Sequence, residues 1–348
     1  MPRVNRHDKW THQHWDEPYH SAWKVAIAPG DIFREGGPAN KLAPRTVWNN
    51  ERAFGRYQAF KKQKDLCDQG ILPEIDNLRD FAVDLGETLA PYTVWAITTQ
   101  LTGALRLMFP FADLHYLTRV GARMTKGIKP VRAIEQRMLD PIATIRVGME
   151  TMQEVETRLQ PGCWDSHQYR AGALINAAAR FPLRLGNWQM MRIGEHIDLD
   201  TGRISFTAKE MKRKKPFEGT LSPEALEPIR NYVFRHRSKL ICKGAIDEGY
   251  LWPSEDGGIL HRNSLGRIVK STILRRTGKA FNFHLFRHSA ATFISERKPQ
   301  QTDMAAGVLH HSNLRTTNKH YIKGTKRRAF KMFQSAVRAI IVKGRRKK

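Results

Sequence analysis

The segment His284-Leu285-Phe286-Arg287-His288 gathers side chains that can bind a phosphate or move a proton. His284 and Arg287 are three residues apart, so a helix would place both on one face. A guanidinium can hold two phosphate oxygens at once, and an imidazole can give or take a proton near neutral pH. Such a short pattern also occurs by chance, and alone it is more typical of a solvated basic helix face.

Further segments carry side chains of the same kind, in a definite order along the chain. Arg184 lies upstream, within residues 182–188, and the lysine-rich run 209–215 follows it. Downstream, a His-Ser pair begins at His311, and Tyr321 comes near the end of the chain. The order is therefore arginine, lysine on a β-turn, the histidine–arginine pair, His-Ser and tyrosine.

This order resembles the catalytic domain of the tyrosine recombinase (phage integrase) family, and the helical stretch before it resembles that family's core-binding domain. The resemblance covers residues 44–335. Its most specific part is the run His284-Leu285-Phe286-Arg287-His288-Ser289-Ala290-Ala291-Thr292 with the later His-Ser and tyrosine positions. It implies a mostly α fold with a small antiparallel β-sheet (α+β). It also implies that the two domains close as a C-shaped clamp on duplex DNA.

The resemblance assigns these residues roles in phosphodiester cleavage. Tyr321 would attack the scissile phosphate and form a 3′-phosphotyrosyl bond, which expels a 5′-hydroxyl. Arg184 and Arg287 would hold the non-bridging oxygens, where negative charge accumulates in the transition state. Lys212 would protonate the leaving oxygen, His284 would assist proton transfer at the tyrosine, and His311 would hydrogen-bond the phosphate. Since two guanidiniums supply the positive charge, we expect no metal ion and no other cofactor.

The second histidine and the tyrosine depart from the usual family pattern. His310 stands where the family usually has glycine, so it competes with His311 for the phosphate-binding role. Tyr321 lies one residue farther from His311 than is common, and the intervening turn has to absorb that residue.

The first arginine and the lysine also leave alternatives open. Arg180 competes with Arg184, and Asn187 stands where the family pattern has a glutamate. Three lysines remain alternatives to Lys212 as the proton donor: Lys209, Lys214 and Lys215. We expect Arg192 to be a structural partner of Glu195 or Asp198 rather than a catalytic residue.

The net charge independently indicates a polyanionic partner. The 348 residues contain 59 Lys and Arg against 33 Asp and Glu, which gives a formal net charge of +26. Such an excess repels itself unless a polyanion neutralises it, which favours nucleic acid over an anionic membrane. We expect these basic residues to contact DNA: Lys209, Lys214, Lys215, Arg262, Lys326 and Arg327.

Other features narrow the class of protein. No apolar run approaches the roughly 20 residues of a membrane span, and no signal-peptide pattern follows the polar start. Cys67, Cys163 and Cys242 are odd in number and far apart, so neither a disulfide framework nor a zinc site is indicated. We therefore expect a cytoplasmic, nucleoid-associated protein, encoded by a bacterium or a mobile element.

Hydrophobic periodicity divides the chain into stretches. Residues 1–43 are rich in Trp and His and broken by Pro and Gly, which predicts an irregular N-terminal arm without its own core. Residues 44–128 carry four apolar stripes at helical spacing, which predicts a helical DNA-binding bundle. A basic linker over 129–138 and the catalytic domain over 139–335 follow. Residues 336–348 would either pack on their own domain or, as the family resemblance implies, form an exchange segment that docks into a neighbouring protomer, and they would end in a basic tail.

Within the catalytic stretch we expect helices over 140–159, 166–180 and 223–240, and mainly helices from residue 262 onward. His196-Ile197-Asp198-Leu199 and Arg203-Ile204-Ser205-Phe206 flank Asp200-Thr201-Gly202, which is typical of a β-hairpin. A third strand is predicted over 216–221.

The sequence thus predicts a site-specific DNA recombinase or integrase of a mobile element, acting as a homotetramer on paired sites. Without DNA we expect a monomer or dimer. A type IB topoisomerase-like activity would use the same nick without strand exchange. A DNA-binding regulator on a catalytically retired fold is the non-enzymatic alternative.

Overall fold

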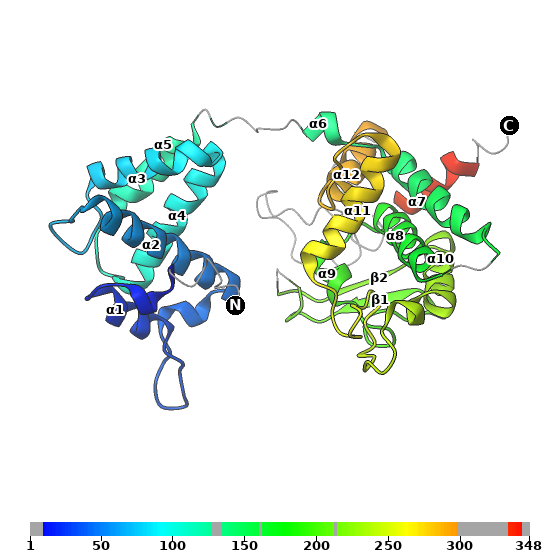
Figure 1. The fold of residues 1–348 in the computed structure, drawn as a ribbon, viewed down its shortest axis with the longest axis horizontal. Helices are drawn as coiled ribbons and strands as arrows, with labels where there is room; N and C mark the ends of the chain where they lie inside the picture. The colour runs from blue at the N-terminus through cyan, green and yellow to red at the C-terminus, as the bar shows by residue number, and fades with distance from the viewer. Residues whose placement is uncertain are drawn as a thin grey trace, which may run out of the picture. The chain divides into compact units, whose positions relative to one another are not determined.

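The computed structural model describes residues 10–126, 128, 134–159, 162–211, 214–297 and 333–342. The chain forms two compact units, Met1–Arg132 (the N-terminal unit) and Ala133–Lys348 (the C-terminal unit), as Figure 1 shows. Each unit has its own hydrophobic core. Within the described ranges, every helix is too short or too polar to cross a membrane.

The N-terminal unit is helical. Its helices are α1 (Tyr19–Ile27), α2 (Pro44–Lys64), α3 (Ile75–Thr88), α4 (Pro91–Met108) and α5 (His115–Thr125), with short 3₁₀ turns at His12–His14 and Pro38–Lys41. Helices α2 and α4 begin with proline, whose fixed φ suits the first helical position. On α3, Leu78, Phe81 and Leu85 are buried at the spacing that predicted this helix. The stretch predicted as a bundle therefore supplies α2 to α5.

The N-terminal segment differs from the irregular arm that the sequence predicted. Residues 19–27 form α1, and Trp15, Tyr19 and Trp23 are buried in the core of the N-terminal unit. The ring centroid of Trp15 lies 4.7 Å from that of Phe54 on α2. Burial of these aromatic side chains in the bundle is more favourable than their exposure to solvent, so the segment packs into the bundle. Their four-residue spacing is the helical signal that the analysis of composition missed.

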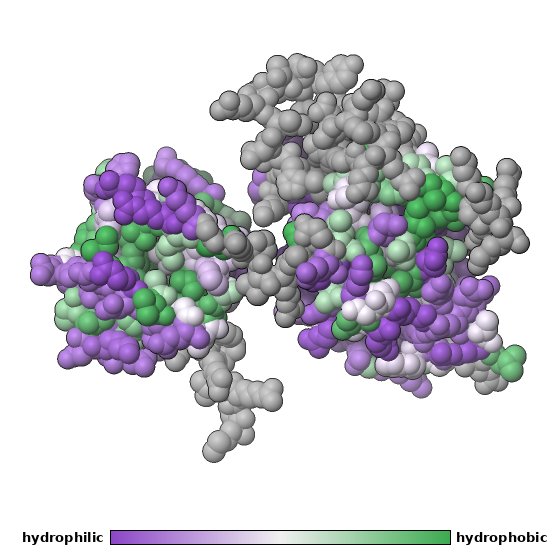
Figure 2. Space-filling model, turned by 90° about the horizontal axis from the view of Figure 1, so that it is seen from above, coloured by the Kyte–Doolittle hydropathy of each residue, from purple (hydrophilic) through white to green (hydrophobic). Residues whose placement is uncertain are grey.

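An apolar groove lies between α3, α4 and α5 and is lined by hydrophobic side chains that include Ile75, Val83, Leu89, Val94 and Met124. Val83 is 62% exposed. Figure 2 shows hydrophobic side chains among hydrophilic ones on the visible face of the N-terminal unit. This unit thus carries apolar surface beside its charged side chains.

The C-terminal unit contains most of the chain's secondary structure. Its elements are α6 (Ile134–Arg137), α7 (Pro141–Glu156), α8 (Cys163–Arg180), α9 (Leu185–Met190), β1 (Arg203–Phe206), β2 (Phe217–Thr220), α10 (Pro223–Arg235), α11 (Arg262–Thr277) and α12 (Leu285–Arg297), with a 3₁₀ turn at Arg237–Leu240. Residues 169–180 of α8 are all buried, so α8 is the central helix of this unit. A Cβ added to Gly172 would lie 2.7 Å from the carbonyl oxygen of Gly148, so glycine is needed where α7 and α8 meet.

The β-structure is smaller than the sequence predicted. Strands β1 and β2 pair antiparallel, with Arg203 opposite Thr220 and Phe206 opposite Phe217. The predicted first strand, residues 196–199, contributes only isolated bridges, from Ile197 to Ile204 and from Ile197 to Ile193. Its pairing is short because the chain turns at both ends: the backbone N–H of His196 bonds back to Arg192, and the Asp198 carboxylate accepts the N–H of Asp200 and of Thr201.

Residues 333–342 are helical and pack on their own C-terminal unit. Phe333 and Val337 are buried, and Arg338 forms a 2.9 Å ion pair with Glu224 of α10. Docking of this segment into a neighbouring protomer stays a prediction. The basic tail lies outside the described residues.

Candidate active site

His284 directly precedes α12 and Arg287 lies in its first turn, and the two side chains differ in exposure. The Asn282 side chain accepts the backbone N–H of His284 at 3.1 Å, and Phe283, Leu285 and Phe286 are buried. This anchoring leaves His284 exposed and directs Arg287 inward, where it is only 3% exposed. The His284 and His288 rings stand edge to face, 4.8 Å apart.

Arg287 links α12 to the segment that carries Arg184. Its guanidinium Nη1 donates a 3.0 Å hydrogen bond to the carbonyl oxygen of Pro182, two residues before Arg184. Arg184 is the N-cap residue of α9, and its carbonyl accepts the N–H groups of Asn187 and Trp188. Because Trp188 is fully buried, it fixes this turn while Arg184 stays partly exposed. Two segments more than 100 residues apart in sequence thus meet at the predicted arginines.

Arg180, the competitor for the first arginine position, lies in a different environment. It is 4% exposed on α8, and its Nε donates a 3.1 Å hydrogen bond to the side-chain oxygen of Asn176. Its charge also helps to lower the pKa of Glu224, against the opposing effect of burial, which raises it. Arg180 is therefore bonded within α8 and lies near the Glu224 carboxylate of α10.

The lysine-rich run connects β1 to β2. Lys209, Lys214 and Lys215 are exposed on this connection. Lys214 adopts a positive φ of 50°, and its backbone N–H donates to the carbonyl oxygen of Met211 at 2.8 Å. This bond joins the two residues that flank positions 212 and 213.

The other predicted site residues divide into two groups. Arg262 is exposed at the first residue of α11, whose N-cap is His261. The remaining candidates lie outside the described residues: Lys212, His310, His311, Tyr321, Lys326 and Arg327.

Arg192 has the structural role that the sequence predicted. Its guanidinium forms 3.7 Å ion pairs with Glu195 and with Glu248, and it donates to the hydroxyl of Tyr250 at 3.0 Å. It does not pair with Asp198, whose carboxylate instead closes the turn after it.

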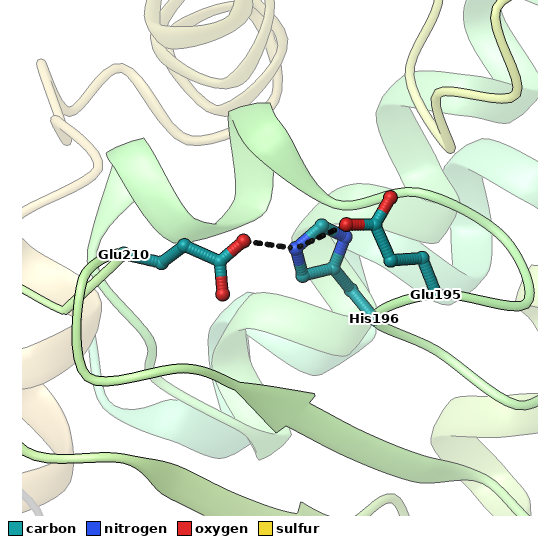
Figure 3. Close-up of side chains that lie close together, drawn as sticks. All are labelled: Glu195, His196 and Glu210. Carbon is teal, nitrogen blue, oxygen red and sulfur yellow. Dashed lines mark hydrogen bonds and ion pairs between the residues drawn. The ribbon is translucent and has the colours of Figure 1, made fainter.

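The structure also brings together a group that the sequence analysis missed. Glu195, His196 and Glu210 converge, and their ligand-type atoms lie within 4.8 Å of one another (Figure 3). His196 had been predicted only as the start of a strand, and no spacing signal links it to Glu210, because a turn and β1 separate them. The imidazole Nδ1 accepts the backbone N–H of Arg192 at 3.1 Å, so Nε2 carries the proton and donates to Glu210. A metal ion would need the Nε2 lone pair, so this group fits a hydrogen-bonded pair better than a metal centre.

Comparison with known proteins decides the family. A sequence model of the phage integrase family matches residues 149–328, more than half of the chain. The chain belongs to the phage integrase family. No curated protein matches it. The resemblance to tyrosine recombinases drawn from the sequence is confirmed.

Two solved structures are similar to the chain. One is a lambda integrase (residues 75–356), crystallised as a dimer bound to a COC′ core site. It has 13% sequence identity and a TM-score of 0.50, covering 83% of this chain and 90% of that one. The other is XerA recombinase, with 14% identity and a TM-score of 0.36, covering 88% of this chain and 95% of that one. The predicted mostly α fold with a small antiparallel sheet is confirmed.

Proposed function

We propose that this chain is a site-specific DNA recombinase or integrase that cuts and rejoins DNA through a 3′-phosphotyrosyl intermediate on Tyr321. The observation that supports the proposal is the 3.0 Å bond from Arg287 to Pro182, because it joins Arg287 to the segment that carries Arg184 in a phage integrase family member. Exposed His284 directly precedes α12, and its carbonyl oxygen accepts the backbone N–H of Arg287 at 3.2 Å.

The chemistry follows from the residue types. The Tyr321 oxygen forms a bond to the scissile phosphorus, and the bond from phosphorus to the 5′ oxygen breaks. The phenol, with an ordinary pKa near 10, has to lose its proton as it attacks, and His284 assists that transfer. The guanidiniums of Arg184 and Arg287 bind the non-bridging oxygens, and either His311 or His310 adds a hydrogen bond.

The leaving 5′ oxygen gains a proton as it departs. The lysine-rich connection between β1 and β2 supplies that proton, from Lys212 or from one of Lys209, Lys214 and Lys215. Because the phosphotyrosyl bond keeps the energy of the broken bond, a second 5′-hydroxyl can attack it and rejoin the strand without ATP.

The remaining assignments concern DNA binding and assembly. A lambda integrase of this fold was crystallised on a core site, which supports duplex DNA as the partner. We expect the two units to close around the duplex as a C-shaped clamp, and four protomers to assemble on paired sites. The basic residues named above, Arg262 among them, bind phosphates without reading sequence. A mobile-element origin and a place on the nucleoid belong to the same proposal.

Covalent capture on nicked DNA tests this function. The protein is mixed with overlapping duplex oligonucleotides that cover the DNA on both sides of its own gene. Each duplex carries a nick just beyond the tested phosphate. Cleavage then releases a short 5′-hydroxyl fragment that diffuses away, so the protein stays attached and migrates as a denaturant-resistant complex. We expect the complex with wild type and its complete loss with Tyr321→Phe, which retains the ring but cannot attack.

A complex that persists in Tyr321→Phe would show that another residue is the nucleophile. Binding without any covalent complex in wild type would indicate the non-enzymatic regulator. If the protein forms the covalent complex and relaxes supercoiled DNA but never recombines two sites, it has the topoisomerase-like activity.

A further inference from the structure

We propose that His196 and Glu210 form a positioning pair that holds the lysine-bearing connection between β1 and β2, so that its lysine can protonate the leaving 5′ oxygen. This inference rests on the proposed function. It assigns a role to two residues outside the set that the family resemblance supplied.

The pair is buried at its histidine end, and the partners of the two ring nitrogens define one tautomer of the imidazole. The His196 side chain is only 5% exposed, and its ring packs against that of Phe206 with centroids 5.0 Å apart. Since Nδ1 accepts the N–H of Arg192, Nε2 donates to Glu210 Oε1 at 2.9 Å (Figure 3). This bond lowers the pKa of Glu210, so the carboxylate stays charged. Glu195 Oε1 lies farther from Nε2, at 3.9 Å, so this buried donor makes its hydrogen bond to Glu210.

Glu210 also bonds to Thr207, at the start of the connection between β1 and β2. Its second oxygen, Oε2, accepts both the backbone N–H and the hydroxyl of Thr207, at 2.7 and 2.8 Å. The turn that leaves β1 is therefore closed by Glu210 and tied to the body of the C-terminal unit by His196. Lys209 lies inside this turn and is exposed.

A second anchor follows immediately. Met211 is buried, and its Sδ lies 3.2 Å from the amide nitrogen of Asn187 on α9, three residues after Arg184. Asn187 holds the position where the family pattern has a glutamate. The connection is thus fixed beside the helix that presents Arg184, and the next described residues, Lys214 and Lys215, are exposed again. The connection is therefore anchored at Glu210 and Met211 and carries exposed lysines on either side. A proton donor that has to reach one oxygen of a bound phosphate needs such a fixed backbone.

Two substitutions of His196 separate the link to Glu210 from the rest of the site. The amide of His196→Asn reaches the position of Nδ1 and can still accept the Arg192 N–H, but it is too short to reach Glu210. The amide nitrogen of His196→Gln reaches the position of Nε2 and can restore the bond to Glu210. Glu210→Ala, at a residue 21% exposed, breaks the same link from the other side and guards against a failure of the Asn variant to fold.

The readout is the single-turnover rate of covalent complex formation on two substrates. One has the natural scissile phosphate mapped by covalent capture, and the other has sulfur in place of the 5′-bridging oxygen. A thiolate leaves without being protonated, so cleavage of the sulfur substrate does not need the lysine. We expect His196→Asn and Glu210→Ala to slow the oxygen substrate about 100-fold, the effect of losing a general acid. The sulfur substrate should be cleaved nearly as fast as by wild type, and His196→Gln should recover most of the rate on oxygen.

If His196→Asn and Glu210→Ala slow the oxygen and sulfur substrates by the same factor, the positioning role is overturned. Equal slowing would indicate damage to the whole site. Unchanged rates in both disruptive variants would overturn it as well. Loss of wild-type activity with a chelator and its return with Mn²⁺ or Zn²⁺ would replace the pair with a metal centre. If wild type cleaves neither substrate, the proposed function itself fails, and the inference fails with it.

Discussion

Each unit holds a carboxylate whose oxygens accept several hydrogen bonds, and the surroundings of the two differ. In the N-terminal unit, Asp68 is 2% exposed in its side chain and accepts bonds from Tyr57, Lys61, Asn77 and the backbone of Glu74. In the C-terminal unit, Glu210 binds His196 and Thr207, and exposed lysines lie on both sides of it at positions 209, 214 and 215. The Asp68 carboxylate joins α2 to α3. The Glu210 carboxylate fixes a segment that carries exposed lysines, so the same kind of bonding can serve stability in one unit and chemistry in the other.

The largest expected effect is on the rate of cleavage, and it should differ between two buried arginines of the C-terminal unit. Arg287 and Arg180 are similarly buried; Arg287 bonds to the segment of Arg184, and Arg180 bonds to Asn176 on its own helix. We expect Arg287→Lys to slow covalent complex formation by about 10²–10³-fold, because a lysine cannot bind two phosphate oxygens in a planar fork. Arg184→Lys should behave in the same way, and DNA affinity measured by fluorescence anisotropy should change little.

Arg180→Lys is the matched control for burial. It should lower the melting temperature yet cleave at nearly the wild-type rate once folded. If Arg180→Lys is as slow as Arg287→Lys while Arg184→Lys is normal, Arg180 is the first arginine of the site.

The next effect tests whether Asp68 acts on stability alone. Asp68→Asn removes a buried charge paired with Lys61 and should destabilise the N-terminal unit by about 3 kcal/mol. Hydrogen-exchange mass spectrometry should then show faster exchange in α2 and α3 and unchanged exchange in α7 and α8. The exposed pair of Asp76 and Arg79 supplies the control, since Asp76→Asn should have almost no effect. A slower cleavage rate in folded Asp68→Asn protein would remove the contrast with Glu210.

The smallest expected effect is on the free energy of unfolding in acid. The two units should lose stability in different pH ranges. His236 is 4% exposed and stacks on Tyr169, and burial lowers its pKa from 6.5 to about 4. As pH falls between these values, the unfolded chain binds a proton that the folded unit excludes, so the C-terminal unit loses at most ~3 kcal/mol.

Asp68 acts in a lower range. Burial raises its pKa, but the bonds from Asn77, Lys61 and the Glu74 backbone outweigh burial and lower it overall. Its contribution is therefore present above the unfolded pKa of about 3.9 and is lost only below it. Thermal unfolding followed across the range from about pH 7 to about pH 4 should show a smaller decline in His236→Asn than in wild type. An equal decline in both proteins would mean that another group carries the acid sensitivity of this unit.

Much of the fold follows from local sequence signals. The helices α2 to α5 are bounded by prolines and carry apolar stripes at steps of three and four residues, so their existence could be predicted. The segment around Trp15 and Tyr19 was misjudged, because its Gly and Pro content suggested a loop while its aromatic spacing matched a helix. The predicted start of α8 at residue 166 is three residues late: Gly162 is the N-cap, and Asp165 reaches back to accept its N–H at 2.7 Å.

The site could be predicted only in part. The order of residue types from Arg184 to Tyr321 carries the family signal and needs no three-dimensional information. The bond from Arg287 to Pro182 and the pairing of His196 with Glu210 depend on how distant segments pack, which no local pattern encodes. The predicted strand at His196 hid the second contact, because a strand residue was expected to pair with β1 rather than with the turn beyond it.

The most direct test of the central claim is to map the residue that becomes attached to DNA. The captured complex is digested with protease and nuclease, and tandem mass spectrometry locates the nucleotide remnant on the peptide chain. We predict that Tyr321 alone carries the remnant, through a bond to a 3′ phosphate. A remnant on any other residue, or one joined through a 5′ phosphate, would contradict the account.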